Sequence, residues 1–219
     1  MTERLILTIG LIGGTGNLGP GLALRWASAG YGVIIGSRSE EKAQGVAEEL
    51  NSKLDIEGIR GMMNEDAIKA ADICVMTVNH TAHGKTIEAI KDHLGGKILV
   101  DATARVDFRD PVPPDPPAAA RIAQDVIGEA GTVVAAFQTV PAHELQNNIG
   151  MPLDIDVLVF SDDDKAASEV IKLAEGADMR AYHAGRLNNA IVAEGLTALL
   201  IAMNKKYESR TGTIRISGL

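Results

Sequence analysis

The chain has 219 residues, 46% of them hydrophobic and 23% charged, which is enough to bury the core of one large domain or of a domain with an appendage. A formal net charge of −8 and an aromatic content of 3% argue against nucleic-acid binding, which needs a basic face and rings that stack on bases. The single cysteine, Cys74, lies in an apolar run, so no disulfide framework exists and a cytoplasmic protein is expected. We expect no signal peptide before the first apolar run.

That first run, Ile6–Ile12, predicts a buried strand, and a glycine-rich turn follows it. Gly14, Gly16 and Gly19 have the spacing that lets the backbone approach a pyrophosphate at the N-terminus of a helix. A helical segment runs from Leu22 through Ala29 and is followed by a second short strand. Strand, glycine turn, helix and strand together predict a dinucleotide-binding βαβ unit.

The second strand, Val33–Ile35, ends in residues that favour NADP over NAD. An NAD enzyme normally carries a carboxylate here to bind the ribose 2′-hydroxyl, and that carboxylate would repel a 2′-phosphate. This chain has Ser37, Arg38 and then Lys42, a hydroxyl and two cations. They predict a 2′-phosphate site, unless both cations are ordinary solvated charges at the start of the next helix.

Alternating elements continue toward the middle of the chain and predict an α/β fold, a Rossmann-type doubly wound, mainly parallel sheet. They are the helices Glu40–Leu50 and Thr81–Leu94 and the strands Ile73–Val78, Lys97–Asp101 and Val133–Phe137. The carboxyl ends of parallel strands share one edge, where substrate contacts are expected. Residues on that edge are Asn79 and His80, Ala102 and Thr103, and Gln138 to Ala142.

Five prolines between Asp110 and Pro117 predict an extended surface loop leading into a helix over Ala118–Ile127. A further strand, Ile155–Phe160, and a helix over Ala166–Ala174 follow, with Asp162 to Asp164 as the start of that helix rather than a cation site.

A metal site is not predicted. His80 and His83 have the i, i+3 spacing of helical ligands, but no neighbouring carboxylate or cysteine in the sequence completes a set. Positioning of a cofactor, or surface exposure, explains the two histidines better. No nucleophile motif is present either, which fits hydride transfer, since that reaction needs placement of the reactants.

The C-terminal part, residues 184–219, forms a small helical unit after an NADP-binding domain over residues 1–183. The segment Leu187–Met203 is apolar on nearly all sides, so we expect it to be buried between the sheet domain and a second subunit. Its apolar centre of about thirteen residues is shorter than the ~20 that cross a bilayer. A basic cluster follows, either a solvated tail or a dock for an anionic ligand: Lys205, Lys206, Arg210 and Arg215.

Five motifs are distinctive in combination: Gly13–Gly19, Gly36–Arg38 with the following Glu-Glu-Lys-Ala, Asn64–Ala67, Thr139–Ala142 and Thr213–Leu219. Together they resemble the family of NADPH-dependent coenzyme F420 reductases, over essentially the whole chain. The resemblance implies reversible hydride transfer between the nicotinamide C4 of NADP(H) and C5 of an 8-hydroxy-5-deazaflavin, coenzyme F420, as co-substrate. It implies no catalytic side chain, and we expect small-molecule partners and a homodimer.

The resemblance also implies a set of site residues. The pyrophosphate contacts Thr15, Gly16, Asn17 and Leu18, the 2′-phosphate contacts Ser37, Arg38 and Lys42, and the nicotinamide end is lined by Val78 and Ala142. On the deazaflavin side we expect Gln138, Pro141, Lys206 and Arg210. The chain departs from the family pattern at Asn79 to Ala82, in place of Pro-Trp-Glu-His, and at Gln138, in place of histidine.

Those departures leave two other classes open. One is an NADP-dependent reductase of an imine or carbonyl substrate, for which His80, His83 or Tyr182 would have to donate a proton. The other is a non-catalytic protein that senses NADP.

Overall fold

A computed structural model describes residues 6–219. The expectation that no targeting segment precedes the first strand concerns residues 1–5, which lie outside the described residues.

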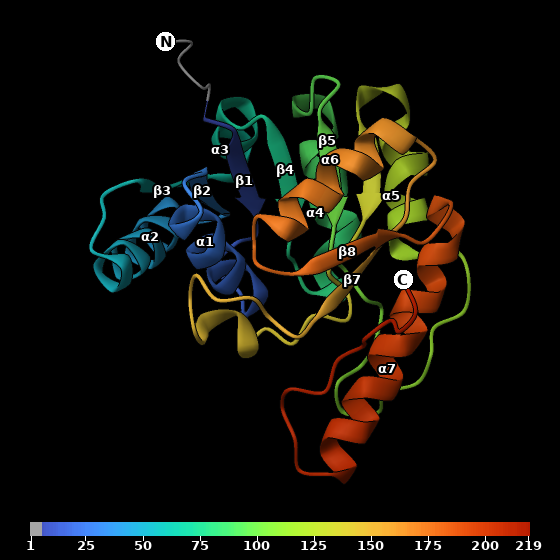
Figure 1. Cartoon of the computed structure of the whole chain (residues 1–219). Coiled ribbons are helices and arrows are strands. Elements are labelled where there is room, and N and C mark those ends of the chain that lie inside the picture. The colour runs from blue at the N-terminus through green and yellow to red at the C-terminus, as the bar shows by residue number, and fades with distance from the viewer. Residues whose placement is uncertain (1–5) are drawn as a thin grey trace.

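Six parallel strands form the main sheet and confirm the Rossmann-type fold (Figure 1). The strand order is β3-β2-β1-β4-β5-β6, so the order reverses between β1 and β4, where ligands bind in doubly wound sheets. The strands are β1 (Thr8–Ile12), β2 (Gly32–Ser37), β3 (Ile59–Met63), β4 (Ile73–Met76), β5 (Ile98–Asp101) and β6 (Thr132–Ala135).

Side chains along each strand alternate between the two faces of this sheet. Helices cover both faces, and each face thus has its own apolar core. Ile9 and Leu11 of β1 enter one core, with Leu22 and Trp26, and Ile12 enters the other. The helices that join the strands are α1 (Leu18–Ser28), α2 (Glu40–Leu54), α3 (Asn64–Ala70), α4 (His83–Ile90) and α5 (Ala119–Ile127).

Two elements of this α/β unit, strand β3 and helix α3, were not among those predicted. Strand β3 lies at the edge of the sheet, and only its first residue is fully buried, so its sequence lacks a continuous apolar run. Two predicted strands also end earlier than expected, at Met76 and at Ala135.

A second, two-stranded parallel sheet packs beside the main one. It contains β7 (Asp156–Val159), which was predicted as a strand, and β8 (Arg180–His183), which was not. Helix α6 (Asp164–Glu175) begins where expected, with the Asp163 carboxylate accepting hydrogen bonds from the backbone N–H groups of Lys165 and Ala166. The proline-rich segment is irregular, as predicted.

Helix α7 (Ala190–Lys206) extends away from the sheet, and the C-terminal tail folds back along it (Figure 1). We expect this apolar helix to be buried between the sheet domain and a second subunit, and the single chain shows only the first of these two contacts. Only one stripe is buried, while Val192, Leu199 and Met203 on the opposite face are each more than half exposed. The helical stretch Leu187–Lys206 has 20 residues and a mean hydropathy of 1.2 in its most apolar window, so by length and composition alone it could cross a membrane.

Candidate functional site

The glycine turn after β1 is closely packed on one side and open on the other. Gly13 has φ +68°, and a Cβ there would lie 2.4 Å from the side chain of Val78, while a Cβ at Gly19 would lie 2.3 Å from the carbonyl oxygen of Gly14. A Cβ at Gly16 would have more room, since its nearest neighbour, the backbone oxygen of Thr77, would lie 3.8 Å away. Gly13 and Gly19 therefore shape the turn, and the backbone at Gly16 is free to approach a ligand.

Helix α1 begins directly at this turn, at Leu18, after the exposed residues Gly16 and Asn17. Asn17 precedes the first helical residue, and its side chain makes no capping hydrogen bond. The backbone N–H groups of the first turn are thus available to an anion, and the helix dipole favours negative charge there. The structure brings Thr15, Gly16, Asn17 and Leu18 together between the end of β1 and the first turn of α1.

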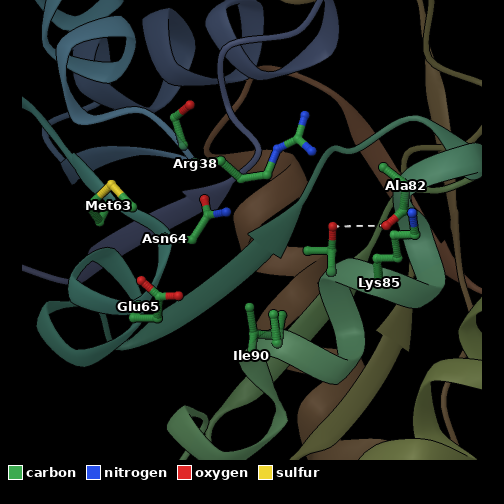
Figure 2. Close-up of a pocket in the computed structure, with 10 residues that line it drawn as sticks. Arg38, Met63, Asn64, Glu65, Ala82, Lys85 and Ile90 are labelled. Carbon is green, nitrogen blue, oxygen red and sulfur yellow. Dashed lines mark hydrogen bonds between the residues drawn. The ribbon is translucent and has the colours of Figure 1, made fainter.

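A cavity of about 140 Å³ lies between the carboxyl ends of β2 and β3 and helix α4. Ser37 and Arg38 line it, and Lys85 faces Arg38 from the opposite wall (Figure 2). Glu65 lines the cavity as well. Lys42 does not: it is exposed in the first turn of α2, where its backbone N–H donates to the Ser39 hydroxyl at 3.3 Å. Of the expected 2′-phosphate residues, the structure brings two into one cavity and leaves the third beside it.

The two residues expected at the nicotinamide end both lie against the start of the dinucleotide unit. Val78 packs over Gly13, and a Cβ placed on Gly21 of α1 would lie 3.4 Å from the backbone oxygen of Ala142. Buried Arg25 fixes the chain after Ala142, because its guanidinium donates to the carbonyl of Leu145 at 3.0 Å.

The C-terminal part holds the loop after β6. The Thr197 hydroxyl of α7 donates to the carbonyl of Gln138 at 2.9 Å, and the Thr213 hydroxyl of the tail donates to the carbonyl of Thr139 at 3.2 Å. Glu194 locks α7 in place, since its buried carboxylate accepts from the backbone N–H of Ala119 at 2.6 Å. Sequence reasoning had no signal for these contacts, which join residues 59 to 75 positions apart.

One histidine differs from its expected setting. His83 is buried, and its Nε2 lies 2.7 Å from an oxygen of Asp101, which is fully buried. The fold brings this carboxylate to His83 from 18 residues away, a contact that the sequence did not indicate. Within residues 6–219, no group of three His, Cys, Asp or Glu side chains could hold a metal ion.

The expected basic cluster is largely dispersed. The Lys205 ammonium donates to the backbone carbonyls of Phe108 and Arg109 in the proline-rich segment, and Arg215 forms ion pairs with Asp154 and Asp156. Lys206 and Arg210 are exposed, and within the described part of the chain neither forms an ion pair. Lys205 and Arg215 therefore bind groups of the protein itself, carbonyls in one case and carboxylates in the other.

Fold and site together define the class of protein: a Rossmann-fold nucleotide-binding oxidoreductase. A family model described as "NADP oxidoreductase coenzyme F420-dependent" matches residues 8–105. The F420-dependent NADP reductase of Methanothermobacter thermautotrophicus is 38% identical over 100% of this chain and 98% of its own length, and that of Methanocaldococcus jannaschii is 38% identical over 97% and 99%. The chain belongs to the family of F420-dependent NADP reductases.

Solved structures agree on the fold. A protein from Arthrobacter sp. FB24 superposes with a TM-score of 0.77 at 23% identity, covering 97% of this chain and 98% of its own. An imine reductase from Bacillus cereus superposes with a TM-score of 0.59 at 17% identity, covering 92% of this chain and 60% of its own. At these identities the likeness concerns the fold alone.

Proposed function

We propose that this chain transfers a hydride reversibly between NADP(H) and coenzyme F420. The observation that carries the proposal is the identity of 38% to F420-dependent NADP reductases over the whole chain, in a fold whose glycine turn and sheet edge suit a dinucleotide. In the balanced reaction, NADPH, a proton and oxidised F420 give NADP⁺ and reduced F420. The two coenzymes supply the redox chemistry, and the protein supplies binding and orientation.

The residues have the following proposed tasks. Backbone groups of Thr15 to Leu18 bind the pyrophosphate, and Ser37 and Arg38 bind the 2′-phosphate in their cavity, with Lys42 adding charge from its rim. Val78 and Ala142 would hold the nicotinamide end against the start of α1. Gln138 and Pro141 would contact the deazaflavin, whose anionic tail would meet Lys206 and Arg210.

The C-terminal part has a proposed role of its own. Residues 184–219 form the deazaflavin side of the site, which the hydrogen bonds of Thr197 and Thr213 to the loop after β6 support. A second copy of the chain covers the exposed apolar face of α7, formed by Val192, Leu199 and Met203, and gives a homodimer in the cytoplasm. We propose a protein partner rather than lipid for this face.

A direct assay tests the function. NADPH mixed with oxidised F420 and the protein should bleach the visible absorption band of F420, in a reaction that depends on the amount of protein. NADPH oxidation by an imine or carbonyl compound, with F420 unchanged, would instead assign the chain to the first alternative class. Tight NADP binding without any turnover would assign it to the sensors.

A further inference from the structure

The edge of the sheet contains buried polar atoms that no described residue satisfies. They include the hydroxyl of Thr103 after β5, the side-chain oxygen of Gln138 after β6 and Nδ1 of His80 after β4. Thr103 is 3% exposed and Gln138 is 8% exposed. Leaving a buried polar atom without a partner costs about 1–3 kcal/mol, so such atoms concentrate where a ligand completes the hydrogen bonds.

Asp101, the last residue of β5, fixes the two most deeply buried of these side chains. Its carboxylate accepts from the backbone N–H of Thr103 at 2.9 Å, and its backbone carbonyl accepts from Nε2 of Gln138 at 2.9 Å. His83 holds the other carboxylate oxygen at 2.7 Å. Asp101 therefore positions both Thr103 and Gln138.

The orientation of the Gln138 amide follows from its hydrogen bond to the backbone carbonyl of Asp101. A backbone carbonyl only accepts hydrogen bonds, so the nitrogen of the amide must face Asp101, and the oxygen must point away from it. The Thr197 hydroxyl holds the backbone carbonyl of Gln138, and the residue before it, Phe137, adopts the left-handed region with φ +73°. A bulky residue at positive φ costs on the order of 1–3 kcal/mol, which the packing of Phe137 against Trp26 helps to offset.

A hydroxyl that can donate and an amide oxygen that can accept, on two residues that both hydrogen-bond to Asp101, together complement a planar group carrying both a C=O and an N–H. We propose that Thr103 and Gln138 bind such an amide group of a coenzyme ring, Thr103 donating to its carbonyl and Gln138 accepting from its N–H. The inference rests on the proposed function. Two groups have this chemistry: the carboxamide of the nicotinamide and the imide of the deazaflavin.

Thr103→Val is the principal test, because valine keeps the shape of threonine and removes only the hydroxyl that lacks a partner. The free protein should keep or gain thermal stability, since a buried unsatisfied atom disappears. Coenzyme recognition should nevertheless weaken about tenfold in kcat/KM. A purely structural threonine would not give this combination of equal or higher Tm and weaker recognition.

Gln138→Met shows which of the two groups, the nicotinamide carboxamide or the deazaflavin imide, binds to Gln138. If the partner is the nicotinamide carboxamide, the penalty appears with NADPH and vanishes with the reduced 3-acetylpyridine analogue, which has no amide N–H, whereas Thr103→Val weakens both because the carbonyl remains. If the partner is the deazaflavin imide, both variants raise KM for F420, and the Gln138→Met penalty is the same with either nucleotide.

Gln124→Met is the matched control. Gln124 lies on α5 and accepts from the backbone N–H of Val133 at the opposite end of β6, so its loss should lower Tm and leave the nucleotide comparison unchanged. Calorimetric titration separates this inference from the proposed function, because weaker binding by Thr103→Val needs no turnover: NADP⁺ is the probe if the partner is the nicotinamide, and oxidised F420 is the probe if the partner is the deazaflavin. Kinetic constants and NADP⁺ affinity of both variants within twofold of the parent protein would overturn the inference.

Discussion

Replacing Arg38 by alanine should remove most of the preference for NADP(H) over NAD(H). Arg38 lines the cavity at the end of β2, so its guanidinium can meet a 2′-phosphate there. A charge-assisted hydrogen bond contributes about 1.5–3 kcal/mol, and the exposure of Arg38 places it toward the lower end of that range. Since about 1.4 kcal/mol corresponds to a factor of ten, KM for NADPH should rise about tenfold, with KM for NADH nearly unchanged.

Initial rates over a concentration series of each nucleotide, at fixed F420, measure this effect. A residual preference should survive in Arg38→Ala, because Ser37 and Lys85 also line the cavity. Lys42→Ala should have a smaller effect, since Lys42 lies outside it. Arg60→Ala is the control: Arg60 is exposed on β3, beside β2, and does not line the cavity. Equal efficiency of the unmodified protein with NADH and NADPH would refute the assignment.

Four further predictions follow from the chemistry and the packing. NADPH deuterated at the transferred C4 position should pass its label to F420 without loss to solvent, and chelators should leave the rate unchanged; label washed out into water would contradict direct transfer. Neutralising Lys206 and Arg210 together should raise KM for F420, more at low salt, with NADP binding unaffected, and an unchanged KM would make them merely solvated charges. Burial raises the pKa of the Cys74 thiol to about 12, so iodoacetamide at pH 8 should neither modify it in the native protein nor reduce activity. Burial alone would raise the pKa of Asp156, but hydrogen bonds from Arg180 and from a backbone N–H of the tail hold this pKa below its usual value. The contribution of Asp156 to stability is therefore present above pH ~4 and is lost as pH falls through the lowered pKa. Asp156→Asn should lower Tm at pH 7 and make Tm less dependent on pH in acid.

The fold was predictable wherever the chain signals locally. Buried strands such as β1 and β2 are continuous apolar runs, and the glycine turn between β1 and α1 has a fixed spacing. Strand β3 gave no such signal, because an edge strand with half-exposed side chains needs no apolar run. Strand β8 gave no signal either, since it is partly exposed and its partner β7 lies 24 residues away.

The candidate site was predictable as a location and not as a set of contacts. The rule that carboxyl ends of parallel strands share an edge is enough to place Thr103 and Gln138 in one region. It did not indicate that Asp101 supports both, because that depends on side-chain directions at the ends of two strands. The same limit explains the error at Arg215, whose partner Asp156 is 59 positions away and appears only when the tail folds back.

Net charge makes the distribution of cations decisive in this chain. Both coenzymes are anionic and the protein carries a formal charge of −8, so diffusion alone would bring them to a repelling surface. Arg38 and Lys85 bring positive charge to the cavity and outnumber the single carboxylate there, that of Glu65. At the far end of α7, Lys206 and Arg210 remain exposed, while Lys205 donates to the carbonyls of Phe108 and Arg109. Two separated positive regions on an acidic protein would guide two anions to different places. The reacting rings, which carry none of the phosphate and carboxylate charge of the coenzymes, would then meet between those regions, at the edge where Thr103 and Gln138 lie.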